Sequence, residues 1–334
     1  MPQPTQSDLH VNALLTNFSI MFQQPADGFV AEKVFPFVPV LKQSDRYAVH
    51  SRADFNRNVV RKRAASTESS GGGYKVDTTP TYFCDVWSHH KDIDDQVRAN
   101  ADSVFNLDSD ATIWLTGLHR IAREVDWAAK FFAASLWTST LTGVASAPGA
   151  NQTLQWNDMN SSPIVDVRNA KRMVQLASGG YRPNVGVMGR QVFDTLIDHP
   201  DFVDRVKYGQ SPGPVAKVAL DAMAAVFELD EILVMDAIIN NGVEGVTLNA
   251  NESNAFIGGK SMLLVHRAAR VGLDTPTAGV TFAWTGYFGA TGMGTRMKSF
   301  YIPQIESTRV EMDAAYAHKL VSADMGIWLA TIIA

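Results

Sequence analysis

Residues 163–210 read PIVDVRNAKRMVQLASGGYRPNVGVMGRQVFDTLIDHPDFVDRVKYGQ. The first part has the apolar periodicity of an amphipathic helix, and a Gly-Gly pair follows it. The short apolar segment VGVM then predicts a strand, and a second helix is predicted to begin at Arg190. The sequence His-Pro-Asp-Phe at residues 199–202 is predicted to end that helix. This order of elements decides the fold of the chain.

The stretch belongs to a longer region, residues 161–275, in which helices and short apolar segments alternate. Helices are predicted near 164–177, 190–198 and 214–227, and the apolar segments are VGVM, EILVMDAII and SMLLVHRA. This alternation is typical of an α/β domain with buried central strands. Residues 276–334 return to strand-like segments, which we expect to form an antiparallel set.

Residues 109–137 carry the clearest helical pattern of the chain. At 1.5 Å per residue this helix would span roughly 40 Å. Asp108, Ser109 and Asp110 are candidate N-cap residues. Apolar side chains recur at intervals of four and three, which predicts one continuous buried stripe. We expect that stripe to be the core of the helix, made by Trp114, Leu118, Ile121, Val125, Ala128 and Phe132.

Residues 1–43 do not have the pattern of an independent core. Gly28, Pro36 and Pro39 interrupt an apolar segment, which predicts an extended arm. Its apolar groups lack a partner nearby in the sequence, so they pack on a distant part of the same chain or on a neighbouring subunit. The candidate contacts with a neighbour are Phe29, Phe35 and Phe37.

Residues 44–90 predict a long two-stranded projection. Two strand-like segments flank a stretch that is basic, then small and polar, and then contains three glycines. Such a stretch cannot bury enough apolar surface to fix itself, and an isolated hairpin is marginal in water. We therefore expect the projection to lie on a surface that the hairpin itself does not provide. Its basic residues either pair with an acidic face of a neighbouring subunit or form a solvated loop; they are Arg57, Arg61, Lys62 and Arg63.

The order of these elements, and above all the phrase RPNVGVMGRQVFDTLIDHPDFVDRVKY, resembles the major capsid proteins of tailed bacteriophages. The resemblance implies an α+β fold of the Hong Kong 97 type, with an N-terminal arm, an extended β-hairpin loop, a peripheral domain with a long spine helix, and an axial α/β domain. The ranges are 1–43 for the arm, 44–90 for the extended loop, 91–160 for the peripheral domain with spine helix 109–137, 161–275 for the axial domain and 276–334 for the returning peripheral strands.

The same resemblance implies a function in assembly. The chain would associate through hexamers and pentamers into an icosahedral head that encloses double-stranded DNA. Further implied partners are a portal, a decoration protein and DNA contacted non-specifically. Because the arm follows Met1 almost at once, we expect a separate scaffolding protein. The implied location is the virion, after assembly in the bacterial cytoplasm.

The composition excludes several other classes of protein. Hydrophobic residues are 46% and charged residues 19% of the 334 residues, which is globular rather than disordered composition. A net charge of −5 argues against a surface that binds nucleic acid all over. The single cysteine, Cys84, forms no intrachain disulfide. We expect no membrane association, since no stretch approaches the roughly 18 apolar residues of a membrane span.

No pattern predicts a catalytic residue or a bound cofactor. His89 and His90 begin the best metal-like cluster, but on a strand they point to opposite faces, and the HExxH spacing is absent. We therefore expect no enzymatic activity and no metal. Two alternatives stay open: an encapsulin-type compartment shell protein, which shares the fold, and a soluble metal-dependent hydrolase built on residues 161–275.

Overall fold

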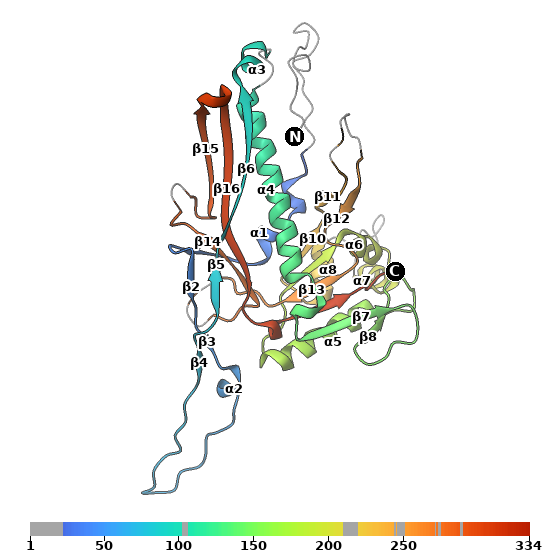
Figure 1. Cartoon of the computed structure of the whole chain (residues 1–334). Helices are drawn as coiled ribbons and strands as arrows, with labels where there is room; N and C mark the ends of the chain where they lie inside the picture. The colour runs from blue at the N-terminus through green and yellow to red at the C-terminus, as the bar shows by residue number, and fades with distance from the viewer. Residues whose placement is uncertain are drawn as a thin grey trace.

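Two β-sheets joined by one long helix organise the chain (Figure 1). Residues 1–22 of the predicted arm and residues 214–219 of a predicted helix lie outside the described part of the chain. This computed structural model describes residues 23–101, 106–209, 220–243, 245, 251–270, 272, 275–287 and 290–334.

The first sheet has six strands in the order β10–β9–β13–β17–β7–β8. It is mixed, because β9 runs parallel to β10 and antiparallel to β13. Every residue of β9 and β13 is buried, as expected for central strands covered on both faces. The strands are β7 Ser139–Val144, β8 Gln152–Leu154, β9 Val185–Gly189, β10 Glu231–Met235, β13 Met262–Val265 and β17 Gly326–Ala330.

Three of these strands come from outside the range predicted for the axial domain. β7 and β8 lie within 91–160, and β17 lies within 276–334. The expectation that all the final strands return to a peripheral sheet is wrong for β17, which lies between β13 and β7. The physical reason is that its segment GIWLA is apolar on both faces, and such a strand requires a central position in a covered sheet.

Helices α5 to α8 pack on one face of the six-stranded sheet. α5 begins with Pro163 at its first turn and ends at Gly179, whose φ of 78° is the left-handed conformation that glycine adopts without strain. Side chains from this layer and from the sheet form one buried core, including Val167, Val174, Leu196, Phe227, Met188 and Leu264. The bounds are α5 Pro163–Ser178, α6 Arg190–Ile197, α7 Pro200–Gly209 and α8 Leu220–Phe227.

The opposite face of this sheet packs against the arm and the C-terminal half of the long helix α4 (Leu107–Phe131). Trp127 and Phe131 of α4 are fully buried there. The ring of Phe35 lies 4.7 Å from that of Phe131, between ring centres. Phe132 makes an edge-on contact with Trp328 of β17 at 4.4 Å. The sheet is therefore covered on both sides.

The arm finds most of its partners within its own chain. Phe29 and Phe35 are 6% and 1% exposed, so of the two alternatives left open for the arm, packing on a distant part of the same chain holds for these two residues. Phe37 begins strand β1 (Phe37–Val40), which pairs parallel with β14 (Gly279–Trp284) and is partly buried. These partners lie far along the chain, which is why no local pattern reveals them.

Glu124 of α4 holds the short helix α1 (Ala31–Val34) of the arm. Its carboxylate oxygens accept hydrogen bonds from the backbone N–H of Val30, at 3.0 and 3.1 Å, and of Ala31, at 2.8 Å. Next to it, the buried Arg123 pairs with Glu32. Burial raises the pKa of Glu124 to about 7, and the N–H donors of Val30 and Ala31 oppose that rise.

The long helix differs from its prediction in its bounds. It begins after Asn106, whose side chain accepts a hydrogen bond from the N–H of Ser109, and it ends at Phe131 rather than at 137. Trp137 folds back and donates from Nε1 to the carbonyl of Phe131 at 2.8 Å, where the helix leaves carbonyl groups unpaired. The 25 residues span about 37 Å. No helix in the described ranges has the length and hydropathy that crossing a membrane requires.

The buried stripe of α4 also differs from its prediction. The fully buried apolar residues are Ala111, Leu115, Trp127 and Phe131. The predicted residues Trp114, Leu118, Ile121, Val125 and Phe132 are all at least partly exposed. The true stripe passes through Arg123 and Glu124, which are buried because the arm supplies their partners.

The second sheet has the order β1–β14–β16–β15, with β6 also paired to β16. On one side of it, Val310 and Ile93 pack against Ala111 and Leu115 of α4. On the other side, ion pairs cross between strands at 2.7 Å: Arg309 with Asp92, Lys298 with Glu311, and Arg296 with Asp313. The remaining strands are β6 Asp85–Asp94, β15 Thr295–Ile302 and β16 Ser307–Leu320, with a separate pair β11 Ile238–Asn240 and β12 Asn254–Phe256.

Matched substitutions in α4 test the corrected stripe. We expect Leu115→Asp to prevent folding, because an unpaired charge replaces a fully buried side chain. Val125→Asp should give soluble protein with a moderately lowered Tm, since Val125 reaches solvent. Soluble expression and thermal unfolding followed by circular dichroism measure the difference. Equal loss of folding in the two variants would contradict the corrected stripe.

The buried Glu124 predicts a specific pH dependence of stability. Its folded pKa lies above the ordinary value of 4.5, so the folded state binds more protons than the unfolded state between about pH 4.5 and 7. This contribution is fully present below about 4.5 and is lost as pH rises through about 7. Relative to Glu124→Gln, the parent chain should therefore lose stability across this window. The control Glu306→Gln, at an exposed glutamate, should retain the parent slope in thermal unfolding.

Candidate functional site

The projecting hairpin is the candidate functional surface, and its base is an ordered antiparallel ladder. β2 (Ser44–Arg46) pairs with β5 (Thr81–Phe83), and further out β3 (Val49–His50) pairs with β4 (Val76–Asp77). Figure 1 shows this segment running away from both sheets to a distant tip. Tyr82 stacks on Phe282 of the second sheet at 4.3 Å, which fixes the base to the body.

The short helix α2 (Arg52–Phe55) closes the outer end of the ladder. Asp54 accepts a hydrogen bond from the N–H of Lys75 at 3.1 Å, and Ser51 donates its N–H to the carbonyl of Lys75 at 2.9 Å. The Lys75 N–H holds the pKa of Asp54 below its usual value. Arg52 forms an ion pair with Asp324 of the body. At α2 the two sides of the hairpin are therefore hydrogen-bonded to each other, and the hairpin is anchored to the rest of the subunit.

Beyond α2 the hairpin has no regular structure and no cover. Residues 56–75 form neither helix nor strand, and each is exposed. Arg57 lies 3.5 Å from Asp54, whereas no acidic partner of the other three basic residues is found among the described residues. The predicted basic set thus lies together on one exposed tip: Arg57, Arg61, Lys62 and Arg63.

Large apolar groups are also exposed along the hairpin. Phe55 and Tyr74 are 62% and 61% exposed, and their rings lie 5.4 Å apart next to His50. Val60 is 87% exposed. Phe55 and Tyr74 thus form an exposed apolar pair beside His50, and Val60 is a further exposed apolar side chain of the same segment.

The metal-like cluster does not form a centre. His89 packs against the ring of Trp114 at 5.3 Å, and Nε2 of His90 lies 3.9 Å from Asp92. Within the described residues, no group of three or more His, Cys, Asp or Glu side chains is arranged to hold a metal ion. Cys84 is buried, and burial raises its thiol pKa to about 11. The hydrolase alternative therefore has no support from this cluster.

Sequence reasoning missed two anchoring residues. Glu124 fixes the arm and Arg52 fixes the hairpin, through partners 94 and 272 positions away. Nothing close in sequence to either residue signals its partner. A buried position for Glu124 could have been suspected only from its place three and seven residues before Trp127 and Phe131.

Comparison with known proteins identifies sequence relatives along most of the chain. The major capsid protein of Pseudomonas phage JBD67 is 26% identical over 316 residues, which cover 91% of this chain and 92% of that protein. The major capsid protein of Burkholderia phage BcepMu is 22% identical over 230 residues, 68% of this chain and 69% of that protein. No protein-family model matches the chain.

Solved structures share the fold over nearly the whole length. A phage-related protein from Bordetella bronchiseptica has a TM-score of 0.67 at 17% identity, covering 92% of this chain and 94% of its own. The mature capsid of bacteriophage PhiM1 has 0.62 at 13%, covering 97% and 92%. An encapsulin from Synechococcus elongatus has 0.57 at 11%, covering 95% and 93%. The predicted family and fold class are thus confirmed: the chain is a homologue of phage major capsid proteins and has the Hong Kong 97-type fold.

Proposed function

We propose that this chain builds the icosahedral head of a tailed bacteriophage through hexamers and pentamers, and that the head encloses double-stranded DNA. The observation that carries the proposal is the projecting hairpin, anchored at its base and uncovered from α2 to its tip. Both sequence relatives described above are major capsid proteins, and this similarity supports the same proposal.

The exposed apolar groups of the hairpin supply the driving force for association. Contact with a neighbouring subunit removes Phe55, Val60 and Tyr74 from water, and this burial stabilises the assembled state. Obligate interfaces of this kind typically bury roughly 2,000 Å² or more. Because α2 and the paired strands already fix the base, less conformational freedom is lost on contact.

The basic tip supplies orientation. Arg61, Lys62 and Arg63 pair with an acidic face of the neighbouring subunit in this proposal, which suits a chain whose net charge is −5. In a closed symmetric shell each hairpin meets the same acceptor surface. Several weak contacts per subunit then act together.

The remaining assignments follow from this function and are part of the proposal. The arm is 1–43, the extended loop 44–90, the peripheral domain 91–160 with 276–334, and the axial domain 161–275, except that β7, β8 and β17 join the six-stranded sheet and are assigned with it to the axial domain. The partners are a separate scaffolding protein, a portal and a decoration protein, with DNA contacted non-specifically. The chain acts without catalysis, assembles in the bacterial cytoplasm and resides in the virion.

The fold alone also suits an encapsulin-type shell, since one of the similar structures is an encapsulin. Negative-stain microscopy of particles purified from the infected or lysogenic host, with the ratio of absorbance at 260 to 280 nm, separates the two. We expect closed particles with the high ratio of packaged DNA. Closed particles with the ratio of pure protein, and with enzyme cargo, would contradict the phage head.

Replacing the hairpin tip tests the clamping role. Exchange of residues 57–73 for a short Gly-Ser turn leaves α2 and the Lys75 hydrogen bonds in place. We expect an unchanged circular dichroism spectrum and Tm, because the tip packs on no described part of the body. Closed shells should be absent from micrographs, and free subunits or capsomers should remain.

A conservative variant provides the control for that replacement. Arg57→Lys, Arg61→Lys and Arg63→Lys together keep the length and the charge of the tip, so this variant should still form shells. Closed shells from the Gly-Ser replacement would show that the tip does not clamp a neighbour.

A further inference from the structure

The N-terminal half of α4 carries further apolar side chains beside those that pack on the second sheet. Ala111 and Leu115 face the sheet. By helix periodicity Ile113 falls on the side opposite the sheet, whereas Trp114, Leu118 and Ile121 lie along the flank between the two sides. With Gly117, Arg120 and arm residues Gln23, Gln24 and Phe29, these four line a groove of about 220 Å³.

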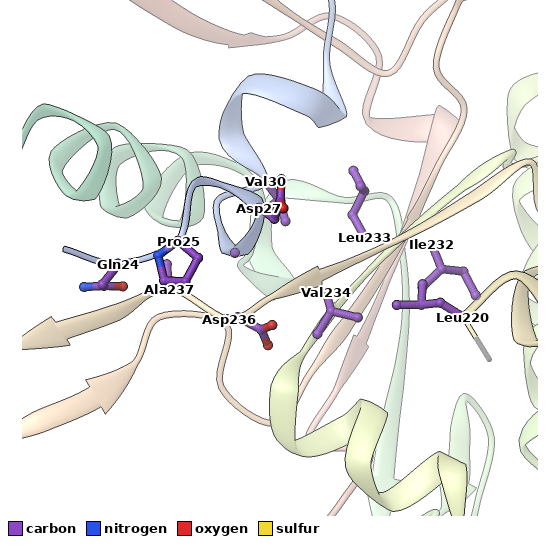
Figure 2. Close-up of a pocket in the computed structure, with 11 residues that line it drawn as sticks. Gln24, Pro25, Asp27, Val30, Leu220, Ile232, Leu233, Val234, Asp236 and Ala237 are labelled. Atoms are coloured by element: carbon purple, nitrogen blue, oxygen red, sulfur yellow. The ribbon is translucent and has the colours of Figure 1, made fainter. Parts of the chain in front are cut away.

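This groove is apolar and open in the described part of the chain. Trp114 is 37% exposed, and the ring contacts recorded for it come from His89 and Lys91 of β6. A second hollow, lined by Pro25, Asp236 and Ala237 among others, lies beside the same stretch of arm (Figure 2). The α4 groove differs from it in having no acidic residue in its lining, whereas Asp27 and Asp236 line the second hollow. Contact of the apolar side chains of the groove with water costs free energy.

The chain enters its described part at this groove. Gln23 and Gln24 line it, so residue 22 is covalently placed at its edge. Gln24 is fixed there by hydrogen bonds from the Ile238 N–H to Oε1, at 2.9 Å, and from Nε2 to the Ile238 carbonyl, at 2.7 Å. Any partner for the groove therefore competes with a segment that is already tethered next to it.

The sequence before Gln23 has the composition that such a groove requires. Residues 11–22 read VNALLTNFSIMF, with Val11, Leu14, Leu15 and Phe18 at intervals of three and four. This spacing gives one apolar face if the segment is helical. Twelve helical residues would span about 18 Å, and the groove from Ile113 to Ile121 spans about 12 Å on the same rise.

We propose that residues 11–22 of the same chain occupy the α4 groove, with their apolar face on Trp114, Leu118 and Ile121. The tether through Gln23 makes closure within one chain cost less entropy than capture of a second copy. The arm is then held at the groove, at Glu124 and at β1. This docking concerns the single subunit and does not depend on the proposed function.

Thiol labelling of Leu118→Cys tests the docking. Cys84 adds little background, because it is buried and its thiol pKa is raised to about 11. We expect removal of residues 2–22 to raise the maleimide labelling rate roughly tenfold or more, which corresponds to about 1.4 kcal/mol of docking free energy. The paired substitution Leu15→Asp with Phe18→Asp in the full chain should have the same effect if the truncated chain does not fold.

The control is Thr112→Cys, an exposed position on another side of α4. Its labelling rate should be equal in the full and shortened chains. Equal rates for Leu118→Cys in all three backgrounds would overturn the docking proposal, whether or not the protein forms shells.

A second measurement identifies the chain that supplies the segment. In the double variant Phe18→Cys with Leu118→Cys, mild oxidation should give a crosslinked monomer on a non-reducing denaturing gel. A crosslinked dimer, with labelling still protected, would overturn the same-chain assignment and show that a second copy fills the groove.

Discussion

Burial of Trp127 and Phe131 between the arm and the six-stranded sheet is the interaction on which the rest of the subunit depends. It joins three segments that are far apart in sequence, because Phe35 covers Phe131 from one side and the sheet covers it from the other. Glu124 can accept hydrogen bonds from the N–H groups of Val30 and Ala31 only while these aromatic contacts hold the arm in place. The hydrogen bonds that the Glu124 carboxylate accepts are thus a consequence of apolar packing.

The hairpin, like the arm, carries large apolar side chains, but its outer part packs on no other segment of the described chain. Where Tyr82 reaches Phe282 the segment is paired into strands and Tyr82 is buried, whereas beyond α2 the segment is irregular and exposed. The transition coincides with the last contact to the body, the ion pair of Arg52 with Asp324. A stiff base with an uncovered tip presents its apolar groups at a defined distance from the subunit, which suits contact with a neighbour at a repeated spacing.

Local signals in the sequence were sufficient for elements whose partners are regular and close. The Gly-Gly pair that begins at Gly179 follows α5 as predicted, and VGVM forms part of the buried strand β9. The stripe of α4 could not be predicted in this way. Sequence periodicity assigns a polar residue to the exposed side of a helix unless the partner of that residue is known. The partners of Glu124 and Arg123 lie in the arm. The exposed basic tip was predictable because exposure needs no partner, whereas the acceptor surface on a neighbour has no trace in one sequence.

The charges of the subunit divide into two groups with different consequences for assembly. On the second sheet, Arg309 and Lys298 are already paired across strands within the chain, so they have little to offer a neighbour. The tip residues Arg61 to Arg63 are exposed, and no acidic partner for them is found among the described residues. In the proposed shell, electrostatic recognition therefore falls to the hairpin, and the contact joins a basic projection to a different, acidic patch. A contact between two different patches is heterologous, and it closes a ring when the rotation from one subunit to the next is a whole fraction of a turn. In the proposed shell, the asymmetry of charge within one subunit thus gives each contact a direction, from the basic hairpin of one subunit to the acidic patch of the next.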